Sequence, residues 1–244
     1  DEPWQFLAAC EEYHECVITC NRQYTNLMVA TDATCSGLQI LSGLARDEST
    51  ARLVNVVPGN HPMDAYKVIA DTARPNVPES VQPFMDRKVT KRTVMTIPYN
   101  AKPYSNRSYI RDALKEKGVE IDKEQLTETV KAVRDAMDRI VPGPMQVMKW
   151  IETEVAAAID RGEQEIQWVT PSGFVVTQRL MKYKIQRIDL QLLGRCQVKI
   201  ATGETSEVDK AHHKNATAPN LIQSLEASLL CLSTLRFNAP ISLI

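Results

Sequence analysis

Residues 87–100 carry the sequence RKVTKRTVMTIPYN, which places four cations within six residues, followed by an apolar run and a tyrosine. Read as a helix, the segment brings Arg87, Lys91 and Tyr99 to roughly one face, because side chains four residues apart lie above one another. The helix is expected to end near Pro98, because proline lacks the N–H that would continue it. A cationic face with an aromatic ring at its end can hold a polyphosphate and stack a base. A solvated basic surface has the same pattern, and this segment alone leaves both interpretations open.

The composition limits what the whole chain can bind. Its 244 residues are 43% hydrophobic and 24% charged, with a net charge of −1, which is typical of a globular protein and excludes a general polyanion binder. Any nucleic-acid surface must therefore be local, and the basic residues cluster at 87–92, 107–117 and 179–187. No apolar run approaches the ~18 residues of a membrane span, and the acidic N-terminus lacks the basic region of a signal peptide. The six cysteines form no Cys-x-x-Cys pair, so we expect reduced, mostly buried thiols and no zinc site.

Hydrophobic periodicity predicts an α-rich α+β fold. Helices are expected at 4–20, 64–72, 87–98, 107–117, 123–140, 145–161 and 218–237, and a further helix is expected from a cap at Thr34 or Ser36 to the break at Pro58. Strands are expected at 27–31, 167–169, 174–177 and 241–244, with a longer β-like run at 182–200 and a polar loop at 202–214.

Asp32 follows the first predicted strand and precedes a helix. A carboxylate at a strand end, beside backbone carbonyls, suits Mg²⁺, which prefers oxygen ligands. An aspartate before a helix is also a common N-cap, so Asp32 alone does not decide between the two roles.

The residues around Asp32 and the basic helix together carry a family resemblance. The segments 32–39, 44–47 and 54–55 resemble polymerase motif A of the bacteriophage-type single-subunit DNA-dependent RNA polymerases, which include the mitochondrial enzyme. Val89–Thr96 with Tyr99 resembles their motif B. Three further matches follow the family's order along the chain, at Phe6-Leu7-Ala8, at Thr170-Pro171-Ser172-Gly173-Phe174, and at Ala218-Pro219-Asn220 with Ser224.

The resemblance implies part of a right-hand polymerase. Residues 1–62 would form a palm segment with motif A, and residues 63–165 would form the fingers with motif B. Residues 166–244 would return to palm and fingers and include a β-hairpin specificity loop at 187–214. In that hairpin Arg187, Asp189, Gln197 and Lys199 are the candidates for promoter contacts, because such side chains read base edges in the major groove. Solvent-facing hairpin residues are the alternative for each of them.

The family also implies roles at the reaction centre. Asp32 would hold both catalytic Mg²⁺ ions, and the carbonyl of Ala33 would hold one of them. Lys91 and Arg87 would bind the phosphates of the incoming nucleotide, which suits phosphoryl transfer because that reaction depends on positioning and electrostatics. Arg92 would either assist them or hold the helix in place.

Three residues would contact the nucleoside. Tyr99 would stack at the active site and help to select ribose, with a core tyrosine as the alternative. Gly37 stands where related DNA polymerases carry a bulky glutamate, so it leaves room for a 2′-hydroxyl, although a glycine required for helix packing would look the same. Gln223 replaces a histidine that contacts the nucleotide in the family.

The chain also departs from the family at four other positions. Pro98 stands where alanine or valine is usual, and Asn100 stands where glycine is usual. Glu226 replaces an aspartate, and Leu229 replaces a second histidine.

The function implied for the full-length protein is DNA-templated RNA synthesis from NTPs with two Mg²⁺ ions. In the family the strand at 241–244 leads into a His-Asp-Ser motif whose aspartate is the second metal ligand, and this motif is absent from the sequence. We therefore expect the 244 residues alone to be inactive, and a catalytically silent nucleic-acid-binding segment or a helical interaction protein are the alternatives. The expected partners are template and promoter DNA, nascent RNA and NTPs, bound by a monomer with no membrane association. The expected location is the cytoplasm of an infected bacterial host, with the mitochondrion as the alternative.

Overall fold

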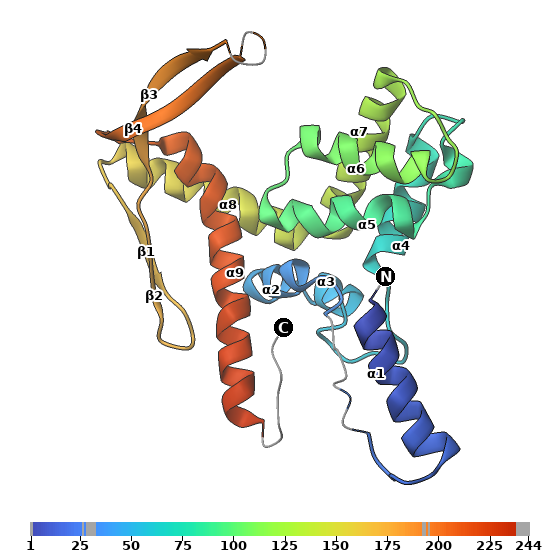
Figure 1. Ribbon diagram of the computed structural model, residues 1–244. Coiled ribbons are helices and arrows are strands. Elements are labelled where there is room, and N and C mark those ends of the chain that lie inside the picture. The colour runs from blue at the N-terminus through green and yellow to red at the C-terminus, as the bar shows by residue number, and fades with distance from the viewer. Residues whose placement is uncertain (1, 26, 28–32, 192–193, 195, 238–244) are drawn as a thin grey trace. The chain divides into compact units, whose positions relative to one another are not determined.

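The computed structural model describes residues 2–25, 27, 33–191, 194 and 196–237 (Figure 1). They form two compact units, one of residues up to Ala33 together with Phe237, and one of Thr34–Arg236. No helix in these described ranges is long and apolar enough to cross a membrane.

The described residues of the first unit contain one helical segment. Helix α1 (Pro3–Tyr13) starts with proline at its first position, where the missing N–H costs nothing, and continues into a π-helical turn, His14–Ile18. The helix predicted at 4–20 is thereby confirmed, with its end at Ile18. The strands predicted at 27–31 and 241–244 fall almost wholly outside the described residues, and Leu27 is not in a strand.

The second unit contains the remaining helices. They are α2 (Ser36–Ala45), α3 (Glu48–Leu53), α4 (Ala65–Ala73), α5 (Arg87–Thr96), α6 (Pro103–Lys115), α7 (Lys123–Ile140), α8 (Pro142–Asp160) and α9 (Lys210–Arg236). Each helix predicted for this unit is present, and α6 and α8 start earlier than expected, each at a proline. The single helix expected to run to Pro58 is wrong in its extent, because α2 ends at Ala45, where Arg46 takes a left-handed φ of +52°. A separate helix, α3, follows after the N-cap Asp47.

The apolar side chains of this unit gather in three clusters. The largest cluster lies among α4, α5, α6 and α7 and includes Ile69, Val89, Ile110 and Val133. A smaller one joins α2, α8 and α9 through Leu41, Met148 and Ile222, and a third lies between α8 and α9, at Ile151, Val155 and Ala218. Figure 1 shows α8 crossing α9, with α2 beside both. Helix α5 therefore packs into the largest cluster, and the turn after it reaches the second.

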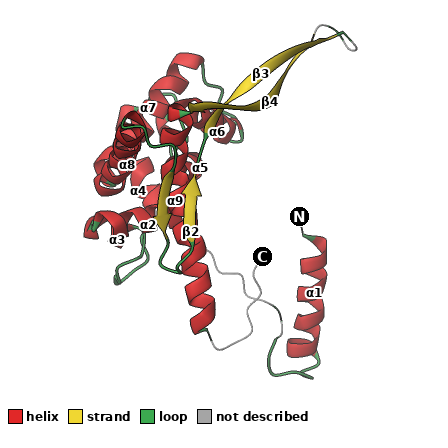
Figure 2. Cartoon of the chain, turned by 90° about the vertical axis from the view of Figure 1, so that its left-hand side faces the viewer, coloured by secondary structure: helices red, strands yellow, loops and turns green. Residues whose placement is uncertain are grey.

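Two antiparallel ribbons complete this unit. Strands β1 (Ile166–Val169) and β2 (Val175–Gln178) pair with each other, and β3 (Met181–Leu190) pairs with β4 (Cys196–Val208). Figure 2 shows the β3–β4 ribbon extending away from the helices. The α-rich α+β class is thereby confirmed.

The polar loop predicted at 202–214 is wrong, because β4 continues to Val208 and α9 begins at Lys210. The polar residues of this stretch bind across the ribbon: the Thr202 hydroxyl donates to the Lys184 carbonyl, and Lys182 pairs with Glu207 at 2.8 Å. An exposed two-stranded ribbon has no buried face to impose apolar alternation, so its sequence has the composition of a loop.

The prediction of mostly buried, reduced thiols is corrected in part. All six cysteines are free, but Cys35 alone is buried.

Candidate nucleotide-binding site

Asp86 fixes the start of α5. Its carboxylate accepts hydrogen bonds from the backbone N–H groups of Lys88 (3.0 Å) and Val89 (3.2 Å), and it pairs with the Lys117 ammonium at 2.6 Å. Burial raises the pKa of Asp86, but these hydrogen bonds outweigh burial, so the net pKa is lowered. The carboxylate therefore stays ionised and caps the helix.

One face of α5 is buried, and this leaves the side chains of the opposite face exposed. Val89, Thr90, Thr93 and Val94 are fully buried. The Thr90 hydroxyl donates to the Tyr66 carbonyl at 2.9 Å, which ties α5 to α4. Because this face is held in the core, Arg87, Lys88, Lys91 and Arg92 are turned outward and exposed.

Three of these four cations have defined partners. The Arg87 Nε donates to Asp64 at 2.7 Å, and its guanidinium lies 5.1 Å from the centre of the Tyr66 ring. Lys88 pairs with Glu116 at 2.7 Å.

Arg92 lies over the ring of Tyr109 on α6, with its guanidinium carbon 4.3 Å from the ring centre. This contact is of the kind expected if Arg92 holds the helix. The Lys91 side chain is exposed and forms no hydrogen bond or ion pair with any residue that the structure describes.

Tyr99 lies where three elements meet. Helix α5 ends at Thr96, and a 3₁₀ turn, Ile97–Tyr99, directs the Tyr99 side chain to α2 and α9. Its hydroxyl lies 2.5 Å from Glu226 Oε1 and 3.3 Å from Ser36 Oγ. Burial, and then the hydrogen bond to Glu226, raise the pKa of Tyr99 to about 12, so the phenol is neutral at ordinary pH.

Gly37 lies directly against this turn. A Cβ atom at Gly37 would stand 2.8 Å from Pro98 Cβ and 3.4 Å from Tyr99 Cε2. Carbon atoms pack at about 3.5–4.0 Å, so the position has no space for a side chain without movement of Pro98. Packing against the turn is therefore a sufficient physical reason for glycine at this position.

The backbone conformation at position 100 accounts for the asparagine that stands after Tyr99, where the family usually has glycine. Its φ of +65° lies in the left-handed region, where glycine is favoured and asparagine is the best-tolerated alternative. Its side chain donates to the Asn215 carbonyl at 2.9 Å. Pro219 lies inside α9 and has no N–H to offer to that same carbonyl four residues earlier, so Asn100 satisfies a group that proline leaves unpaired.

The four hairpin candidates form two cross-strand pairs. Arg187 lies opposite Lys199, and Asp189 opposite Gln197, whose amide donates to Asp189 at 3.1 Å. Alternate residues of a strand share a face, so all four side chains lie on one face of the β3–β4 ribbon, and all four are exposed.

A family model of DNA-dependent RNA polymerases matches residues 1–242, nearly the whole chain. The chain belongs to this family. It is 30% identical to the DNA-directed RNA polymerase of Enterobacteria phage K11 over 98% of its length, and 31% identical to the human mitochondrial DNA-directed RNA polymerase over 96%. It covers 32% of the phage protein and 20% of the human one, so it spans between a fifth and a third of these curated relatives. The resemblance to the phage and mitochondrial polymerases is thereby confirmed.

The metal ligands that the polymerase resemblance implies are only in part described. Asp32 lies outside the described residues, and Ala33 is exposed. Among the residues whose placement is given, no group of three or more His, Cys, Asp or Glu side chains is arranged to hold a metal ion. Gln223 is described and lies exposed on α9, next to the buried Ile222.

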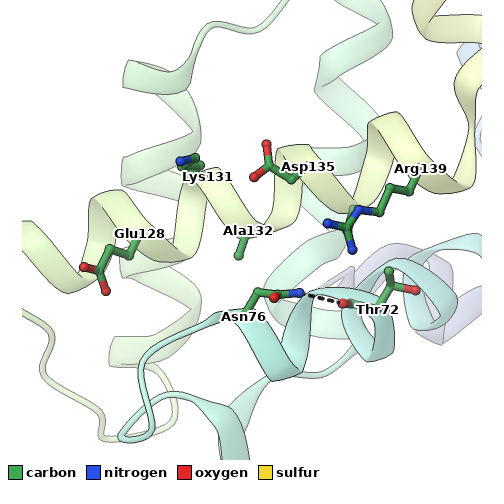
Figure 3. Close-up of a pocket in the computed structure, with 8 residues that line it drawn as sticks. Thr72, Asn76, Glu128, Lys131, Ala132, Asp135 and Arg139 are labelled. Carbon is green, nitrogen blue, oxygen red and sulfur yellow. Dashed lines mark hydrogen bonds between the residues drawn. The ribbon is translucent and has the colours of Figure 1, made fainter.

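A separate pocket of about 300 Å³ lies between the end of α4 and α7 (Figure 3). Glu128, Lys131, Asp135 and Arg139 line one side of it and Thr72 and Asn76 the other. None of the residues predicted for the polymerase site lies in it.

The partners of the site residues come from distant parts of the chain. Asp64 and Glu116 neutralise α5 from positions 23 and 28 residues away, and Tyr109 approaches from a different helix. No local pattern marks such contacts. Glu226 was visible as a departure from the family, but its contact with Tyr99 appears only in the folded chain.

Proposed function

We propose that this chain takes part in DNA-templated RNA synthesis and that α5 holds the phosphates of the incoming NTP. One observation carries the proposal. Within the described part of the chain, Lys91 is an outward-facing cation without a partner, on a helix whose other cations are engaged. An ammonium in that condition attracts phosphate without first losing an ion pair.

The neighbours of Lys91 would then have different roles. The Arg87 Nε is bound to Asp64, and we assign the second phosphate contact to the remaining guanidinium N–H groups of Arg87. Arg92 keeps its contact with Tyr109 and positions the helix. Phosphoryl transfer gains from such fixed positive charge because negative charge accumulates as pyrophosphate leaves.

We assign the metal to the segment before α2. The Asp32 carboxylate and the Ala33 carbonyl are oxygen donors of the kind that Mg²⁺ takes, and they are adjacent in sequence. When bound, Mg²⁺ would neutralise phosphate charge and orient the reacting oxygens. Within the second unit Gly37, Tyr99 and Gln223 are assigned to the sugar and base of the nucleotide, and Gly37 packs directly against Pro98 and the Tyr99 ring.

We assign residues 1–62 to the palm, residues 63–165 to the fingers, and residues 166–244 to a further segment of palm and fingers. We assign the β3–β4 ribbon to promoter recognition. Arg187, Gln197 and Lys199 supply donors for base edges from one exposed face. Asp189 accepts from Gln197 with one carboxylate oxygen, and its other oxygen is assigned to accept from a base. The proposed partners are template and promoter DNA, nascent RNA and NTPs, bound by a monomer in the cytoplasm of a phage-infected bacterium.

ATP binding to the 244-residue chain, measured by calorimetry with Lys91→Ala, tests the phosphate assignment. Loss of a hydrogen bond to a charged group costs about 1.5–3 kcal/mol, so we expect binding to weaken roughly 10- to 100-fold. Lys149→Ala is the matched control, because Lys149 is an exposed lysine on α8. Equal ATP affinity of Lys91→Ala and Lys149→Ala would contradict the proposal. Binding of DNA with no binding of ATP would favour the catalytically silent nucleic-acid-binding segment instead.

A further inference from the structure

We propose that Glu226 is a positioning residue for Tyr99 and makes the Tyr99 hydroxyl oxygen a hydrogen-bond acceptor for a ribose hydroxyl of the bound nucleotide. The inference rests on the proposed function, because it assumes that a ribonucleotide binds beside Tyr99. It goes further by assigning the direction of the hydrogen bonds and the residue that sets it.

The contact between Glu226 and Tyr99 has the geometry of a charge-assisted hydrogen bond. The two oxygens are 2.5 Å apart, which is the distance range of an O–H group bound to a carboxylate. An ionised carboxylate has no proton to give, so the Tyr99 hydroxyl donates and Glu226 accepts. Tyr99 remains protonated in this environment, since its pKa is raised to about 12.

The direction of this bond determines what the Tyr99 oxygen can do next. A phenolic oxygen has one proton and two lone pairs, and the proton is committed to Glu226. The Ser36 hydroxyl, 3.3 Å away, must therefore be the donor in its contact with Tyr99. One lone pair remains for a further donor, and a sugar hydroxyl is a donor of suitable size.

The same contact fixes where the ring lies. Glu226 comes from α9, Ser36 from the first residue of α2, and Tyr99 from the turn after α5. The ring also packs on the apolar cluster of Leu41 and Ile222. Without Glu226 the hydroxyl proton would be free to point at the ligand, and the oxygen would lose its defined acceptor role.

A spectroscopic titration tests the hydrogen bond independently of nucleotide binding. The ultraviolet absorbance of tyrosinate is followed against pH in Glu226→Gln, with Tyr99→Phe identifying the contribution of Tyr99. Removal of the carboxylate should lower the pKa of Tyr99, and Glu226→Asp should keep it raised. Glu128→Gln, a loss of the same charge on exposed α7, should leave it unchanged.

Nucleotide preference tests the function of the hydrogen bond. The affinities for ATP and 2′-deoxy-ATP are measured for the same variants. One hydrogen bond contributes about 1 kcal/mol, so Glu226→Gln should reduce the preference for ATP by about fivefold. Glu226→Asp should retain the preference, and Glu226→Gln should have no further effect in a Tyr99→Phe background.

The outcomes separate the two proposals. If the unaltered chain binds ATP and Glu226→Gln keeps its full preference over 2′-deoxy-ATP, Glu226 has only a structural role and the inference is overturned. If the unaltered chain binds neither nucleotide, the proposed function itself fails and the inference fails with it.

Discussion

Replacement of Gly37 by alanine tests whether the close approach of α2 to the turn at 97–99 requires a glycine. The new Cβ would lie 2.8 Å from Pro98 Cβ, well inside the ordinary carbon–carbon distance. Pro98 cannot easily move away, because Ile97 and Pro98 are buried and Tyr99 is bound to Glu226.

The size of the effect follows from two opposing terms. Overpacking of this kind costs about 1–3 kcal/mol, whereas replacing glycine by alanine inside a helix stabilises by about 1 kcal/mol. The net expectation for Gly37→Ala is a loss of about 0–2 kcal/mol in the free energy of unfolding. The helix term is common to any such replacement in α2, so a second glycine in this helix can remove it from the comparison.

Gly43 provides that control. It lies in the same helix, and a Cβ atom there would meet no atom within 4 Å. Gly43→Ala should therefore stabilise the chain, and the difference between the two variants, about 1–3 kcal/mol, reports the contact with Pro98 alone. In thermal unfolding followed by circular dichroism this corresponds to roughly 2–12 °C between the two midpoints.

Equal midpoints for the two variants would show that the contact between Gly37 and Pro98 does not require a glycine. Gly37 would then have no packing requirement, and room for the 2′-hydroxyl would be the remaining reason for its small size. A large difference would mean that Gly37 is required for packing, whichever sugar the site selects.

Three further predictions concern contacts around the site and the base of the hairpin. Asp86→Ala should lower the free energy of unfolding by about 1 kcal/mol through loss of the α5 cap, and Asp86→Ser, which restores a cap, should recover most of it in urea denaturation. Asn100→Ala should be less stable than Asn100→Gly by about 1–2 kcal/mol in the same assay, because both lose the side-chain hydrogen bonds but only alanine is strained at φ +65°. His213 is fully buried, and burial, followed by the neighbouring His212, lowers its pKa, so the unfolded chain binds the proton more tightly than the folded one. The free energy of unfolding should therefore be constant above about pH 6.5 and fall as the pH is lowered from there toward the folded pKa. His213→Gln should remove this dependence and the exposed His61→Gln should retain it, whereas an identical pH profile for both variants would contradict the assignment.

The helices were predictable where the sequence carries a period and a boundary signal. Segment 123–140 has a strong apolar stripe with Asp122 as a capping box before it, and its extent was predicted correctly. The β3–β4 ribbon was predicted only in part, because its exposed polar strand has the composition of a loop.

The candidate site divides in the same way. The cationic face of residues 87–92 is a local property, because a helix places side chains three and four residues apart together whatever surrounds it. The local sequence does not show which of those cations lacks a partner among the described residues. This depends on Asp64, Glu116 and Tyr109, which reach α5 only when the chain folds.

Residue types and their spacing along the chain were enough to predict the helical class, the family and the group of cations at 87–92. Three facts required the folded chain: Arg87, Lys88 and Arg92 are engaged while Lys91 is exposed, Gly37 is pressed against Pro98, and Tyr99 donates to Glu226. Those three facts depend on contacts between residues up to 127 positions apart. Packing brings such residues together, and no local pattern in the chain records it.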